Sequence, residues 1–223
     1  MEFYGPGNFP VHKDMYFIYG HGGTGKTTLL KQFKGNKILI SFDMSYDVVK
    51  DSGDVWLAVL TKDDLPNIQS VIDSLIDDII AKRTFDVICL DNVTALQNYV
   101  LSSIEKSKDN RQNYNAMQEW FRELGAKLRR GNITVYATAH AKKNKDELGG
   151  SDVDMNEITF NAFTSMFDLV GWIYLKNGER MIDLDPEQGN NAKNRIDDRK
   201  LINADELVEP KAKEKVIEVT KKG

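Results

Sequence analysis

Gly20-His21-Gly22-Gly23-Thr24-Gly25-Lys26-Thr27 is the stretch that decides how this chain folds. It has the spacing G-x-x-x-x-G-K-[ST], in which backbone N–H groups turn inward around a phosphate anion. The glycines permit positive φ angles and a close approach of the backbone to that anion. In such a loop the lysine reaches the β- and γ-phosphates, and the threonine hydroxyl ligates Mg²⁺. The stretch therefore predicts a site for ATP and Mg²⁺, with phosphate-binding residues from Gly20 to Thr28 and Thr27 as a metal ligand.

The residues on either side of this loop have the pattern that the loop needs. Met15–Tyr19 is an apolar run typical of a buried strand. Thr28–Phe33 continues as a helical pattern, whose N-terminal dipole would favour an anion. A glycine-rich turn without a ligand is the alternative interpretation, and the two flanks argue against it.

Composition indicates an ordinary globular protein without internal disulfides. The chain has 223 residues, 41% of them hydrophobic and 29% charged, which suits one domain with at most a small appendage. A net charge of −4 argues against a broadly basic surface but leaves room for a local basic groove. The single cysteine, Cys89, excludes a disulfide framework. No signal-peptide pattern and no membrane-spanning apolar stretch is present, so we expect a cytoplasmic protein without a membrane partner.

Apolar runs alternate with helical patterns along most of the chain, which predicts an α/β fold with a mainly parallel central sheet flanked by helices. The expected strands are Met15–Tyr19, Lys37–Phe42, Val55–Val59, Asp86–Leu90 and Ile133–Thr138, and the expected helices are Leu65–Ile80 and Asn115–Arg129. Ala141–Glu157 is polar and predicts a long loop. Val170–Leu175 and Arg180–Leu184 predict a C-terminal β-hairpin. We expect residues 1–203 to form the domain and residues 204–223 a charged tail.

A second motif, Asp86-Val87-Ile88-Cys89-Leu90-Asp91, is an apolar strand that ends in a carboxylate. Such a strand presents Asp91 at the carboxyl edge of the sheet, where α/β proteins bind ligands, so Asp91 is expected to hold Mg²⁺ with Thr27. The alternative is that Asp91 caps a helix. Asn92 follows, whereas many ATPases of the AAA+ type carry a catalytic glutamate there. Its absence favours the RecA-like branch of these proteins.

Three stretches carry a resemblance to RecA-like proteins. Asp91-Asn92-Val93-Thr94-Ala95-Leu96 is similar to the D-S-V-[TA]-A-L stretch of RecA-like recombinases. Ile133–His140 resembles their next strand, which ends in a polar sensor. Ala192-Lys193-Asn194-Arg195 resembles the K-x-R element of RecA-like motors such as the DnaB and RadA families. The resemblance covers roughly Met15–Arg195 and extends to the short RecA-core proteins of phages, some of which act in single-strand annealing and recombination.

This resemblance implies a RecA-like P-loop NTPase fold and a set of roles. Lys26, Asp43, Asp91 and His140 would act in catalysis within the chain, with His140 sensing the γ-phosphate. Lys193 and Arg195 would enter the ATP site of a neighbouring subunit, in a homo-oligomeric ring or filament with ATP between subunits. The implied activity is ATP hydrolysis coupled to single-stranded DNA binding in phage-type recombination or annealing. A single-strand-binding protein is a further expected partner, and the host cytoplasm the expected location of a phage-encoded chain.

One departure from the family pattern concerns the attacking water. RecA-like proteins usually follow the second strand with D-x-E, and the glutamate polarises that water. Here Asp43 matches the first acid, but Ser45 stands in the place of the glutamate. Either Asp43 or Asp47 serves the water, or hydrolysis is slow. A capping or solvated Asp43 is the structural alternative.

The resemblance also implies two DNA-facing loops, one after the acidic strand and one after the sensor strand. The first covers roughly Ser102–Asn115 and the second Ala141–Glu157. Their cations, which would contact phosphates, are Lys106, Lys108, Arg111, Lys142, Lys143 and Lys145. Acidic neighbours dilute the second cluster, so solvated charged loops are the alternative. Two other functions stay open at this point: a P-loop kinase, and a nucleotide-gated assembly factor that hydrolyses ATP slowly.

Overall fold

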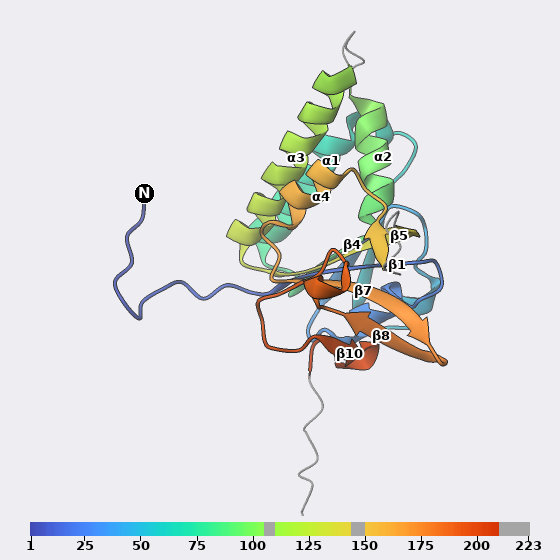
Figure 1. Cartoon of the computed structure of the whole chain (residues 1–223). Coiled ribbons are helices and arrows are strands. Elements are labelled where there is room, and N and C mark those ends of the chain that lie inside the picture. The colour runs from blue at the N-terminus through green and yellow to red at the C-terminus, as the bar shows by residue number, and fades with distance from the viewer. Residues whose placement is uncertain (105–109, 144–149, 210–223) are drawn as a thin grey trace, which may run out of the picture.

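The computed structural model describes residues 1–104, 110–143 and 150–209, which form a mostly parallel sheet with helices packed over it (Figure 1). The strands are β1 (Met15–Gly20), β2 (Lys37–Ser41), β3 (Val55–Val59), β4 (Val87–Asp91), β5 (Thr134–Lys143), β6 (Ser151–Val153), β7 (Leu169–Lys176), β8 (Glu179–Asp183), β9 (Lys193–Asn194) and β10 (Leu201–Asn203). The α-helices are α1 (Ile68–Lys82), α2 (Val93–Ser103), α3 (Asn110–Gly131) and α4 (Glu157–Thr164).

The sheet order is β10-β8-β7-β1-β5-β4-β2-β3. The strands from β7 to β3 in this order pair in parallel, and β8 and β10 extend the sheet as antiparallel strands. The predicted α/β class, the parallel sheet and the C-terminal hairpin, seen here as β7 and β8, are therefore confirmed.

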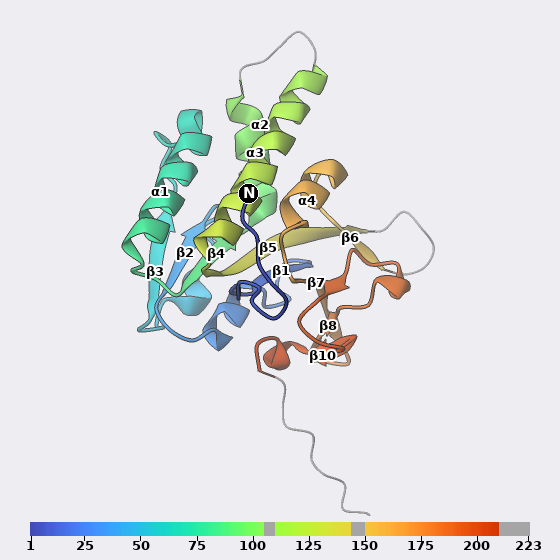
Figure 2. The same ribbon diagram turned by 90° about the vertical axis from the view of Figure 1, so that its left-hand side faces the viewer.

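The two faces of the sheet carry different covers. Helices α1 to α4 lie together on one face, as the two views show (Figure 2). The periodicity of α1 explains its place, because Ile68, Ile72, Ile76 and Ile79 recur at helical spacing and are all buried. The other face is covered by short 3₁₀ helices and by the chain after β8. Burying each large apolar side chain in these layers contributes on the order of 1.5–3 kcal/mol.

The strand register brings the predicted site residues to one edge of the sheet. Gly20 at the end of β1 pairs with His140 of β5 on one side and with Ile173 of β7 on the other. Ser41 at the end of β2 pairs with Asp91 at the end of β4. Because these strands are parallel, their carboxyl ends gather where such sheets bind ligands.

Two predicted segments are partly wrong. Ala141–Glu157 is not one long loop, because β5 continues to Lys143 and pairs antiparallel with β6, from Ala141–Val153 to Lys143–Ser151. Pairing with a distant segment thus extends a strand through polar residues. The other segment, Ser102–Asn115, is helical at both ends, since α2 runs to Ser103 and α3 begins at Asn110.

Smaller differences concern the helix after the phosphate loop and the C-terminal tail. Thr27–Gln32 is a short 3₁₀ helix where the sequence indicates a helix over Thr28–Phe33. In the predicted tail, Ala204 and Leu207 are buried against the second core layer. Residues 210–223 lie outside the described part of the chain. Among the described residues, no helix combines the length and apolarity that a bilayer crossing requires.

Candidate functional site

The phosphate loop joins β1 to the following 3₁₀ helix and turns on two glycines in the left-handed region. Gly23 has a φ of 78° and Gly25 a φ of 91°, conformations that a side chain would strain. Lys26 is only 7% exposed, and its Nζ donates to the carbonyl oxygens of Gly20 at 2.8 Å and His21 at 3.0 Å. The ammonium group is thus held inside the loop, where a bound phosphate would lie.

Burial sets the electrostatics of this lysine. Loss of hydration lowers the pKa of Lys26, and the carboxylates of Asp91 and Asp43 oppose that shift. Neither carboxylate bonds to the ammonium, whose hydrogen bonds go to backbone carbonyls. An anion placed between the loop amides and Nζ would therefore give this buried ammonium a direct contact with opposite charge, which neither carboxylate makes.

Asp91 stands beside the loop at the end of β4. Its Oδ2 accepts a hydrogen bond of 2.6 Å from Thr27 Oγ1, and its Oδ1 accepts one from the Thr138 hydroxyl. Asp91 is 3% exposed, and burial raises the pKa of its carboxyl. The peptide bond between Asp91 and Asn92 is cis. A carboxylate and a hydroxyl in direct contact form the pair of oxygen ligands expected for Mg²⁺.

The donor set suits a metal that arrives with the nucleotide. The described residues hold no group of three or more His, Cys, Asp or Glu side chains that would form an all-protein cage. Mg²⁺ typically takes one or two protein oxygens and completes its shell with phosphates and water. Thr27 and Asp91 fit that requirement.

Asn92 is a site residue that the sequence reasoning did not assign. Its Oδ1 accepts from Ala95 N at 2.9 Å and caps α2, so the cap role considered for Asp91 belongs to its neighbour. Its Nδ2 donates to Asp43 Oδ2 and lies 3.1 Å from His140 Nε2. One amide group thus joins the proposed water-polarising acid to the proposed γ-phosphate sensor. The one signal in the sequence for this role is that Asn92 directly follows Asp91.

These groups line one pocket of about 290 Å³ at the carboxyl edge of the sheet. Its walls include the phosphate loop, Asp43 and Ser45 after β2, and Asp91, Asn92 and His140. Ser45 N donates to Asp43 Oδ1 at 3.0 Å, so the residue in the glutamate position orients the remaining acid through its backbone. Arg180 of β8 also lines this pocket, and no motif in the sequence pointed to it.

Lys193 and Arg195 are not brought to the phosphate loop of their own chain. β9 pairs with the first residues of β7, at the edge of the sheet away from the loop. Lys193 Nζ donates to the Thr164 carbonyl at 2.7 Å, and burial lowers its pKa to about 8. Arg195 N donates to the Asp168 carbonyl at 2.9 Å. Their role in a neighbouring subunit stays a prediction.

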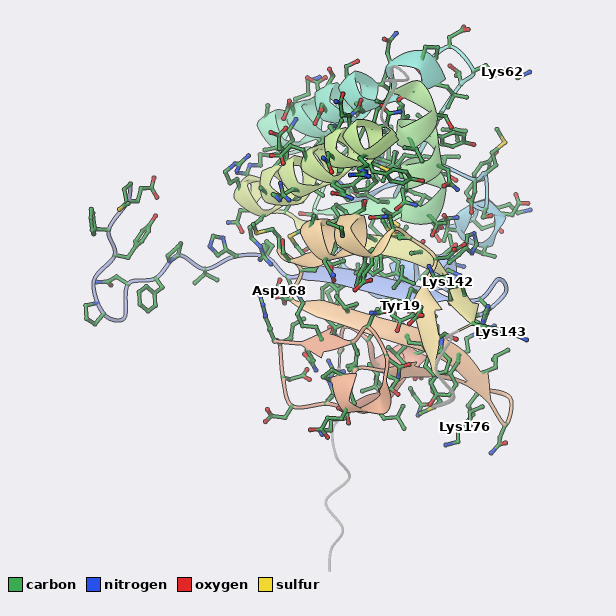
Figure 3. All side chains as sticks on the ribbon, turned by 45° about the horizontal axis from the view of Figure 1, so that its top comes forward. Tyr19, Lys62, Lys142, Lys143, Asp168 and Lys176 are labelled. Carbon is green, nitrogen blue, oxygen red and sulfur yellow. The ribbon has the colours of Figure 1, made fainter. Side chains whose placement is uncertain are left out.

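The structure describes three of the six predicted DNA-binding residues, and these three lie on two different elements. Lys142 and Lys143 end β5 on the side of the molecule opposite Asp168 (Figure 3). Lys142 Nζ donates to the Met155 carbonyl at 3.3 Å. Arg111 lies in the first turn of α3 and not in a loop. Lys106, Lys108 and Lys145 lie outside the described residues.

Replacing Asp43 with alanine should reduce hydrolysis about 10- to 100-fold with little change in ATP affinity, because a group that orients water acts mainly in the transition state. Steady-state turnover and calorimetric ATP titration measure the two quantities. The matched variant is Asp47→Ala, since Asp47 is the other candidate acid and does not line the pocket. A defect in Asp47→Ala alone would move the assignment to Asp47.

Comparison with known proteins agrees with this geometry. None of the curated proteins matches the chain. Residues 12–196 match the AAA domain family, a span that includes the sheet from β1 to β9 and every residue of the pocket. Together with the phosphate loop and its acidic partner, this match shows that the chain belongs to the AAA domain family of P-loop NTPase-like proteins.

Proposed function

We propose that this protein binds and hydrolyses ATP with Mg²⁺ as a RecA-like oligomer, and that hydrolysis is coupled to single-stranded DNA binding in phage-type recombination or annealing. The observation that carries the ATPase proposal is the contact of Thr27 with Asp91 beside a buried Lys26 ammonium, whose hydrogen bonds go to backbone carbonyls and not to a carboxylate. A helix cap or a structural turn needs none of these arrangements.

The residues of the chain divide the work of phosphoryl transfer. The loop amides and Lys26 hold the phosphates, and Thr27 with Asp91 would hold Mg²⁺. When bound, Mg²⁺ would supply positive charge that offsets the negative charge of the phosphates. Asp43 accepts the proton of the attacking water, while Asn92 keeps the carboxylate in place. His140, in contact with the same amide, reports whether the γ-phosphate is present.

The test is the ATPase rate with and without single-stranded DNA, together with the mass of the assembly in the presence of ATP. Stimulation by DNA and an ATP-dependent increase in mass are the expected results. If the protein stays a monomer with ATP and its ATPase rate does not change with DNA, the coupling to DNA is contradicted. Only the nucleotide-hydrolysis part of the proposal then stands.

The contact with DNA is proposed to involve the end of β5. In a double Lys142→Ala/Lys143→Ala variant, the slope of log affinity against log salt concentration should fall by about 1.4, since each phosphate contact on a single strand contributes about 0.7. Anisotropy titrations at several salt concentrations measure it. The control is Lys82→Ala at the end of α1, where Lys82 pairs with Asp78. An unchanged slope would place the contact elsewhere.

One observation favours a second function, a nucleotide-gated assembly factor that hydrolyses ATP slowly. Ser45 lines the pocket where the RecA-like pattern has its glutamate, so the only carboxylates on the pocket wall are Asp43 and Asp91 among the described residues. Single-turnover hydrolysis slower than assembly would support this reading, whereas DNA-stimulated steady-state turnover would support the first.

A further inference from the structure

Arg180 is a cation that reaches the phosphate loop from a distant part of the chain, the β7–β8 hairpin. It lies in β8 directly after the hairpin turn, paired with Leu175 of β7, and its side chain is exposed. Since β7 runs beside β1 and pairs Ile173 with Gly20, the hairpin extends past the point where the phosphate loop begins. Lys176, at the end of β7, marks that hairpin on the same side of the molecule as Lys142 and Lys143 (Figure 3).

The Arg180 guanidinium lies directly over the loop. A Cβ atom added to Gly25 would come within 2.8 Å of Arg180 Nε and 3.1 Å of Arg180 Cδ. Arg180 also lines the pocket together with Lys26 and Thr28. The side chain therefore reaches the loop from outside, while Lys26 occupies its inside.

Within the described residues, this guanidinium has no carboxylate to neutralise it. Arg129 and Arg199, by contrast, each form an ion pair, with Asp168 and Asp197 respectively. A guanidinium has a planar fork of N–H donors that matches phosphate oxygens, and its charge is permanent. Among the described residues, an arginine that lies against the phosphate loop, lines its pocket and forms no ion pair is thus equipped to bind an anion.

We propose that Arg180 binds the phosphate chain of the nucleotide in cis, as a second cation on the opposite side of the loop from Lys26. This inference rests on the proposed nucleotide function and adds a residue to it. It makes the β7–β8 hairpin part of the nucleotide site, so that each chain supplies an arginine to its own ATP, independently of Arg195 from a neighbour.

The experiment is calorimetric titration of the full chain with MgADP and with the magnesium complex of a non-hydrolysable ATP analogue. In Arg180→Ala, affinity for the analogue should fall about 10-fold, as expected for an exposed charge-assisted contact. Arg180→Lys, which keeps the charge but loses the fork, should recover part of the loss. A loss confined to the analogue places the contact at the γ-phosphate, and an equal loss for MgADP places it at the inner phosphates.

The matched control is Lys176→Ala, which removes one positive charge from the same hairpin without touching the pocket. Its affinities should stay within about twofold of the unmodified protein, since an exposed charge at this range is screened. Equal losses in Lys176→Ala and Arg180→Ala, or no loss in Arg180→Ala, would overturn the role of Arg180 and leave the nucleotide site standing. Failure of the unmodified protein to bind either nucleotide would overturn the proposed function, and this inference with it.

Discussion

Lys26→Ala is expected to weaken nucleotide binding strongly and to leave almost no turnover. The ammonium is buried inside the loop, and among the described residues its hydrogen bonds go to the carbonyls of Gly20 and His21, so its charge is available to phosphate. Losing a charge-assisted contact costs about 1.5–3 kcal/mol of binding, or roughly 10- to 150-fold in affinity. Turnover should fall further, by about 10³-fold, because the same charge opposes the negative charge of the transition state.

Calorimetric titration with ATP and Mg²⁺ measures the affinity, and a phosphate-release assay measures the turnover. The control is Lys31→Ala, an exposed lysine on the 3₁₀ helix that follows the loop. Equal unfolding temperatures of the two variants would show that the loss is local. Undiminished affinity and hydrolysis in Lys26→Ala would contradict the site assignment as a whole.

Asp91→Asn should leave the fold intact but reduce Mg²⁺-dependent turnover about 10²- to 10³-fold, because the amide keeps the shape and removes the charge that a hard cation requires. The shifted pKa of Asp91 supports the expectation that the fold stays intact. Burial raises the pKa of Asp91, and a carboxyl whose pKa is raised on folding favours the folded state at low pH. Above both pKa values the buried charge opposes folding, so its removal should offset the one hydroxyl hydrogen bond that the amide nitrogen cannot accept, and the fold should persist at neutral pH.

A magnesium titration of the ATPase rate, paired with thermal unfolding at neutral pH, distinguishes the two effects. Asp78→Asn on the exposed face of α1 provides the matched control. Normal hydrolysis by Asp91→Asn across the magnesium range would leave Asp91 a structural residue. A large drop in unfolding temperature would mean that the bonds from Thr27 and Thr138 outweigh the cost of burying the charge.

Local patterns in the sequence were sufficient for the phosphate loop and most strands. The loop is a continuous motif. The apolar runs that form β1, β2 and β4 are buried on both faces, so the sequence of each run predicts a strand without knowledge of its partners. The parallel direction of these strands then follows from the alternation of strands and helices. Asp91 could be placed at the loop because the strand before it ends at the same edge.

Residues whose position depends on distant partners could not be read in this way. β5 extends through Lys142 and Lys143 only because Ser151–Val153 pairs with it. Arg180 reaches the phosphate loop because β7 lies beside β1, a neighbour relation that is invisible in a window of sequence. In the sequence, Asn92 has only the pattern of a helix cap. Its second role depends on Asp43 and His140, which the fold brings to its amide from two other segments.

The length of β5 has a consequence for how ligand affinities should be measured. His140, level with the phosphate loop, and Lys142, two residues on, lie on the same face of one continuous strand. If ATP shifts this strand and thereby changes DNA affinity by some factor, thermodynamic linkage requires DNA to change ATP affinity by the same factor. A dissociation constant for either ligand then describes this protein only at a stated concentration of the other.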